Sequence, residues 1–168
     1  MATEPRDPAP LPLGRFEGPR AFQQVVREAL AGAVQQGWRE IVVCDASFED
    51  WPLHEREVTD LLQQWSRTGR RFTMVAAGYD SVVRRHPRFV TWRQRWDHIV
   101  ECRVCRHRDP QDFPSILWSP AWAMRRLDLV RSTGLCSSSA DRRLQMREEL
   151  DALLAVSGPG FPSTTLGL

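Results

Sequence analysis

The sequence predicts one α/β domain, with a mostly parallel mixed sheet covered by helices on both faces. Helical and β-branched segments alternate along the chain, an order typical of folds with parallel strands. The connections between these segments are short, which favours right-handed crossovers within one sheet. The length of 168 residues and the hydrophobic share of 42% suit a single domain with one core.

The first part of the chain is expected to supply a helix, a strand and a second helix. Residues 1–19 are rich in proline and glycine and lack apolar periodicity, so we expect a flexible N-terminal arm there. Apolar residues recur at helical spacing from Arg20 to Gln36, and Gly37 is a typical C-cap. The β-branched run 39–44 predicts a buried strand, and the pattern over 53–67 predicts the next helix.

The middle of the chain continues this alternation. Residues 71–77 predict a second strand, and residues 98–104 predict a third. Between them, residues 79–97 carry apolar side chains at helical spacing. Pro87 interrupts this pattern, so it must kink or split the helix.

The last part of the chain is less regular. Residues 115–118 read as a strand, followed by a return strand over 121–127 or by a short helix; we favour the hairpin. The final helix is expected over 141–155, with leucines facing inward at positions 144, 150, 153 and 154. Residues 157–168 are predicted to form a flexible tail, which leaves an α/β domain over 20–156.

Composition excludes several kinds of chemistry. All 23 basic residues other than histidine are arginines, so the chain has no lysine for a Schiff base or a phosphate-binding P-loop. Four cysteines are too few for a secreted disulfide scaffold, and we expect them to be reduced. We find no signal peptide and no apolar run of about 18 residues, so we expect a cytoplasmic location without membrane contact. No cofactor is predicted.

Arginines dominate one segment of the chain. Residues 67–108 carry a net charge of +8, directly after an acidic segment, 39–66, with a net charge of −5. Arg84, Arg88 and Arg95 are predicted to share the outward face of the third helix, with Arg85 and Arg93 beside them. Such a row suits nucleic acid or a phosphate ligand. The alternative is a solvated or acid-paired face, and the pI of about 8.5 is lower than basic nucleic-acid binders usually have.

Two acids follow the first strand. Asp45 and Asp50 lie at its C-terminal end, where open α/β sheets place their ligand sites. With a histidine they would suit a small hydrolase or transferase; otherwise they cap the next helix or pair with arginines. Cys44, paired with His54 or His98, is a further candidate nucleophile, although a strand cysteine usually serves as a small hydrophobic residue.

One spacing resembles half of a zinc site. Cys102, Cys105 and His107 are the types of residue that bind zinc. However, residues three apart on a strand point to opposite faces, and no second cysteine pair supplies the missing ligand. We therefore predict no metal. The ending Leu166-Gly167-Leu168 is either a short recognition tail or disordered.

A family resemblance covers roughly residues 20–156. The order of elements and the segment SILWSPAWAMRRLD (115–128) resemble one half of a phospholipase D-like domain, closest to catalytically degenerate bacterial versions. Active members carry a His-x-Lys motif, which a chain without lysine does not have. The matching Asp112-Phe113-Pro114-Ser115 has no histidine, and residues 134–137 only vaguely match the family's glycine-serine element.

The resemblance implies the fold without phosphodiesterase activity. The leading hypothesis is therefore a non-enzymatic binding or regulatory domain. Because halves of this family normally pair, the resemblance implies a homodimer, with a hairpin carrying Trp118 and Trp122 as a possible surface; an unidentified protein partner is the other possibility. Nucleic-acid or phosphate binding through the arginines and a small enzyme using Asp45 and Asp50 are the alternatives.

Overall fold

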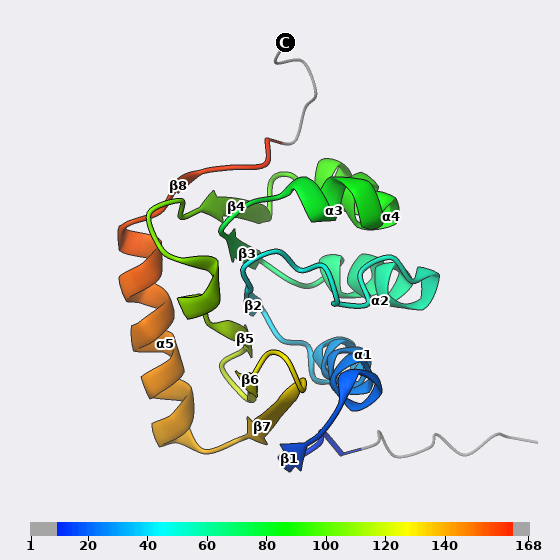
Figure 1. Ribbon diagram of the computed structural model, residues 1–168. Helices are drawn as coiled ribbons and strands as arrows, with labels where there is room; N and C mark the ends of the chain where they lie inside the picture. The colour runs from blue at the N-terminus through cyan, green and yellow to red at the C-terminus, as the bar shows by residue number, and fades with distance from the viewer. Residues whose placement is uncertain (1–9, 163–168) are drawn as a thin grey trace, which may run out of the picture.

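The computed structural model describes residues 10–162, in which eight strands form one sheet in the order β1-β7-β6-β5-β2-β3-β4-β8 (Figure 1). The strands are β1 (Gly14–Phe16), β2 (Glu40–Cys44), β3 (Arg71–Ala76), β4 (Val100–Val104), β5 (Ser115–Trp118), β6 (Ala123–Asp128), β7 (Thr133–Ser137) and β8 (Gly158–Pro159). The helices are α1 (Pro19–Gln36), α2 (Arg56–Ser66), α3 (Asp80–Arg85), α4 (Pro87–Arg95) and α5 (Ala140–Ala155), with a short 3₁₀ turn at Pro110–Asp112.

The prediction of a mostly parallel sheet is wrong. Among the described strands, only β2 with β3 and β3 with β4 are parallel neighbours, and the other five pairings are antiparallel. The physical reason lies after β4, where helical crossovers stop. The segment leading to β5 contains no crossover helix, and tight turns then join β5 to β6 and β6 to β7, which makes these pairs antiparallel.

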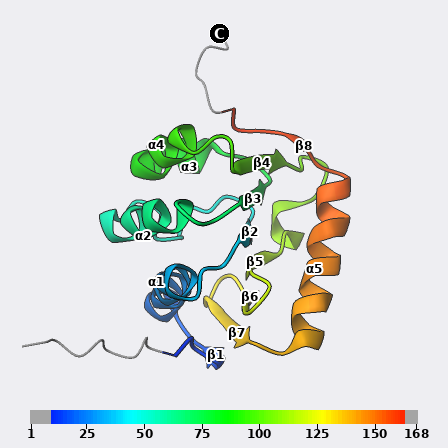
Figure 2. The ribbon, with the colours of Figure 1, turned by 180° about the vertical axis from the view of Figure 1, so that it is seen from behind.

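Helices lie on both faces of the sheet, as expected. Helices α1, α2, α3 and α4 cover one face, and α5 runs along the other (Figures 1 and 2). The larger core lies under α1 to α4 and is rich in aromatic rings, including Phe22, Trp51 and Trp65. A smaller core lies under α5, where Met146, Leu150 and Leu153 are buried.

The predicted inward face of α5 is partly wrong. Leu144 is 58% exposed, whereas Leu150 and Leu153 are buried as expected and Leu154 is partly buried against the core. The buried stripe begins at Met146 and recurs at offsets of 4 and 7 residues. Leu144 lies two residues before that stripe, which places it about 200° around the helix, on the side facing away from the sheet.

The ends of the domain are more ordered than the sequence suggested. Gly14–Phe16 pairs with β7, and Pro19 is the first residue of α1, so the predicted N-terminal arm is too long. At the other end, Gly158–Pro159 pairs with β4, and the Phe161 ring stacks 5.0 Å from that of Tyr79. The ending Leu166-Gly167-Leu168 lies outside the described residues.

Two local predictions are confirmed. Pro87 divides the third helical segment into α3 and α4, with His86 at the joint. The hairpin of β5 and β6 forms, and its turn is held by Ser119, whose backbone and hydroxyl pair with Trp122. Within residues 10–162, no helix combines the length and apolarity needed to cross a membrane.

Candidate functional site

The loop after β2 is built around the carboxylate of Asp45. One carboxylate oxygen accepts hydrogen bonds from the backbone N–H groups of Ser47 and Phe48, at 3.2 and 2.8 Å. These bonds stabilise a tight turn in which Phe48 has a φ of 58°, a conformation unusual for a side chain of that size. The other oxygen accepts from Arg126 at 2.9 Å. Asp45 is 4% exposed, so its charge is compensated inside the protein.

Arg126, which the sequence did not single out, is the centre of this network. It comes from β6, on the antiparallel half of the sheet, and is 5% exposed. Its guanidinium donates to Asp45, to Asp50 at 2.5 Å and to the Ser115 hydroxyl at 2.9 Å. The guanidinium carbon also lies 4.0 Å from the centroid of the Phe22 ring. Both acids predicted at the end of the first strand are therefore ion-paired.

A polar pocket of about 480 Å³ lies beside this loop. It is formed where the segment after β2 meets the joint between α3 and α4, together with one residue of α1. We call it the histidine pocket, and its lining residues are Gln23, Glu49, Asp50, Trp51, His54, Arg85 and His86. Its position after β2 is the one that the sequence predicted for a ligand site.

Two buried side chains in this lining have hydrogen-bonding atoms without a partner in the described chain. The Nε2 atom of His86 lies 2.8 Å from the carbonyl oxygen of Phe48, so Nε2 carries the hydrogen and donates it. Burial lowers the pKa of His86, which keeps the ring neutral and leaves Nδ1 as a bare acceptor. The Nε1–H group of Trp51 is a donor without an acceptor. His54, which is exposed, stacks on His86 with ring centroids 5.8 Å apart.

The structure separates the predicted arginine row. Arg84 lies on α3, whereas Arg88 and Arg95 lie on α4; all three are exposed, and Arg88 donates to the carbonyl oxygen of His54. Arg85 is also exposed, and it pairs with Glu49 at 2.9 Å.

Arg93 does not lie on the surface as predicted. It is buried, and it donates to Asp97 and to the carbonyl oxygen of Phe161. The tryptophans of this helix are also turned inward. Trp92 is buried against Ser66, and Trp96 is partly buried with its N–H donating to Gln63. Neither ring is an exposed platform for stacking a base.

The cysteines do not form a reactive or metal-binding group in the described chain. All four are free and buried, and Cys102 and Cys105 lie in the cores on opposite faces of the sheet, as their spacing predicted. His107 is exposed, and within residues 10–162 no group of three or more potential ligands is placed to hold a metal. Burial raises the pKa of Cys44 well above its usual range, so its thiol is protonated.

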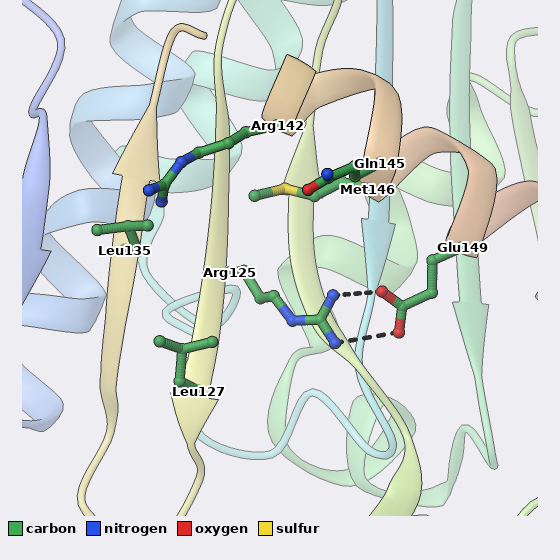
Figure 3. Close-up of a pocket in the computed structure, with 7 residues that line it drawn as sticks. All are labelled: Arg125, Leu127, Leu135, Arg142, Gln145, Met146 and Glu149. Atoms are coloured by element: carbon green, nitrogen blue, oxygen red, sulfur yellow. Dashed lines mark hydrogen bonds and ion pairs between the residues drawn. The ribbon is translucent and has the colours of Figure 1, made fainter. Parts of the chain in front are cut away.

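A second hollow, which we call the α5 groove, lies on the opposite face of the sheet (Figure 3). Its volume is about 440 Å³, and it runs between α5 and the strands β6 and β7. Arg125 and Glu149 form a two-pronged ion pair at one side of it. The lining residues are Arg125, Leu127, Leu135, Arg142, Gln145, Met146 and Glu149. Sequence reasoning predicted a contact surface at Trp118 and Trp122 instead, but both are buried.

No protein-family model and no curated protein matches this chain. A solved structure of TrmBL2, described as an archaeal chromatin protein with a novel mode of DNA binding, has a similar fold with a TM-score of 0.66 and 13% sequence identity. The match covers 90% of this chain and 55% of that one, so this chain corresponds to about half of the archaeal protein. At this identity the similarity establishes a shared fold.

Proposed function

We propose that this chain is a non-enzymatic binding domain and that the histidine pocket is its ligand site. The observation that carries the proposal is the pair of unpartnered polar atoms in the pocket lining, Nδ1 of His86 and Nε1 of Trp51. A buried donor or acceptor without a partner costs about 1–3 kcal/mol. Both atoms are inaccessible in the unbound structure, so side chains of the lining must move to expose them, and a ligand that then supplies both partners recovers that free energy.

The charges of the pocket disfavour an anionic ligand. Glu49 is paired with Arg85, whereas Asp50 shares the single positive charge of Arg126 with the buried Asp45. Since His86 is neutral, the network around the lining keeps one negative charge in excess, together with hydrogen-bonding groups. The volume of about 480 Å³ lies within the range typical of small-molecule sites. We therefore expect a small molecule without net negative charge that both donates and accepts hydrogen bonds.

The candidate catalytic groups are hydrogen-bonded inside the protein or protonated, which disfavours catalysis. Asp45 is inaccessible, and both of its oxygens are hydrogen-bonded, so it is not free to act as a general base. The thiol of Cys44 donates to the carbonyl oxygen of Pro114 and is protonated.

We also propose that the fold is that of a phospholipase D-like half without its catalytic motif. The order of elements and the absence of lysine support this proposal.

The test is a binding screen read at the indole N–H of Trp51 by ¹H–¹⁵N NMR. The probe is a set of neutral, zwitterionic and cationic metabolites added to the full chain. We expect a binding compound to shift the Trp51 indole signal, and we expect His86→Phe to abolish that shift. Arg142→Ala, in the α5 groove on the opposite face, is the control that keeps it. A set in which no compound moves the Trp51 signal contradicts the proposal, and a compound that is chemically converted contradicts the non-enzymatic part.

Nucleic-acid binding is the second candidate function. It is favoured by the DNA binding described for the archaeal structure of similar fold and by the exposed Arg84 and Arg95, which have no ion pair within the described residues. Fluorescence anisotropy with a duplex oligonucleotide from 50 to 300 mM salt tests it. Two phosphate contacts predict a log–log slope of about −2, and Arg84→Ala with Arg95→Ala should remove it. A salt-independent signal excludes this mode of binding.

A further inference from the structure

Coverage of the two faces of the sheet is unequal. Helices α1 to α4 lie along one face, whereas α5 runs along the other from the level of β7 to that of β8 (Figures 1 and 2). A helix is about 10 Å across, and a strand of five or six residues extends about 17–20 Å. A helix that crosses such strands therefore leaves part of each one uncovered. Over β6 and β7 that uncovered part is the α5 groove.

The α5 groove is apolar in its middle and basic at its rim. Leu127 and Leu135 project from the strands, and Met146 projects from α5 (Figure 3). Leu127 is 66% exposed, which is unusual for a leucine on a sheet face beneath a helix. Arg142 stands at the edge of the groove (Figure 3). Arg15 is paired in register with Leu135 and therefore points to the same face of the sheet.

The side of α5 that faces away from the sheet has the complementary character. It carries Leu144, which is 58% exposed, between the exposed acids Asp141 and Glu148. These positions lie opposite the buried stripe of the same helix. Within residues 10–162, neither acid has an ion pair, and neither do Arg142 in the groove lining and Arg15 on the neighbouring strand β1. One molecule therefore displays a basic, apolar groove and an acidic, apolar helix face side by side.

We propose that the α5 groove binds a second copy of this chain. The two copies face each other across a two-fold axis, and the outward face of each α5 packs into the groove of the other copy. Leu144 then contacts Leu127 and Leu135 of the other copy, and Glu148 pairs with the other copy's Arg142. Such an arrangement is self-complementary and closed, as a symmetric dimer requires. It covers the exposed leucines and neutralises the unpaired charges in one contact, and it is independent of the histidine pocket.

The experiment measures the mass of the full chain by sedimentation equilibrium from 5 to 200 µM. We expect a concentration-dependent dimer that Leu144→Glu abolishes. Val83→Glu is the matched control, because Val83 is 55% exposed on α3, on the other face of the sheet. Far-UV circular dichroism checks that each variant is folded. A monomer at 200 µM overturns the proposal and leaves the groove for a different partner.

Charge reversal tests the orientation of the two copies. Glu148→Arg alone and Arg142→Glu alone are each expected to raise the dimer dissociation constant about tenfold, since each places like charges together at the rim. Both changes in one chain should restore dimerisation, because the pair is re-formed with its charges exchanged. A dimer that survives Leu144→Glu, or a double reversal that behaves like the sum of the two single reversals, overturns this interface.

Discussion

Among the buried charged side chains, Arg126 should be the one whose removal lowers the free energy of unfolding most. The variant Arg126→Met keeps the apolar stem above Phe22 but leaves Asp45 buried without its opposite charge. Breaking a buried ion pair in this way costs about 3–5 kcal/mol. Because Asp45 keeps its two backbone hydrogen bonds, we expect a loss near 3 kcal/mol in the free energy of unfolding. For a chain of 168 residues, that corresponds to a fall in Tm of about 6–12 °C.

The assay is urea unfolding followed by tryptophan fluorescence and far-UV circular dichroism. Arg125→Met is the matched control. Arg125 is the preceding residue, it points to the opposite face, and it pairs with Glu149 where both side chains are about one-third exposed. We expect that control to cost less than about 1 kcal/mol. Adding Asp45→Asn to Arg126→Met should recover part of the loss, because the stranded charge is gone. Equal losses for the Arg126 and Arg125 variants, or no recovery in the double variant, would refute the reasoning.

Two further predictions concern protonation. The four cysteine thiols should react with Ellman's reagent at pH 8 only after denaturation, because all are buried and burial raises the pKa of Cys102 and Cys136 to about 12; fast reaction of folded protein contradicts this. Burial lowers the pKa of His86 in the folded protein, so the unfolded chain binds a proton on this imidazole more tightly than the folded chain does. The free energy of unfolding should therefore fall as pH drops below about 6.5. Urea midpoints from pH 8 to 5 should show this fall, and His86→Gln should flatten it. The matched control is His107→Gln, an exposed histidine outside the histidine pocket, which should leave the fall unchanged.

The sequence predicted the individual elements better than their directions. Periodicity located α1, the first three central strands and the division at Pro87, because each depends on residues close together in the chain. The antiparallel half of the sheet and the short edge strands depend on pairing between distant segments. Gly14–Phe16 has no strand-like pattern of its own; it pairs with β7 where Gly134 leaves room for the Phe16 ring. A Cβ atom at Gly134 would lie 2.2 Å from the carbonyl oxygen of Arg125.

The sequence predicted the position of the candidate site but not the ion pairs that its acids form. Asp45 and Asp50 lie after the first central strand, as expected. Both pair with Arg126, which is 81 residues further along the chain than Asp45. One signal for that partner was present. Arg125 and Arg126 are consecutive in a predicted strand, so they point to opposite faces, and a sheet covered on both faces must then bury at least part of one guanidinium. This constraint indicates that one of the two arginines has an acidic partner inside the protein.

Arg126 also links the two halves of the sheet to the histidine pocket. It reaches from antiparallel β6 to the loop after parallel β2, and its contact with Asp50 holds a residue that lines the pocket. The same loop presents the carbonyl oxygen of Phe48 to His86, which fixes the hydrogen on Nε2 and leaves Nδ1 bare. Asp45 therefore supports the loop after β2, and its neighbours Asp50 and Trp51, rather than Asp45 itself, line the pocket. Substitution of Arg126 should disturb ligand binding as well as stability, although its side chain does not line the pocket.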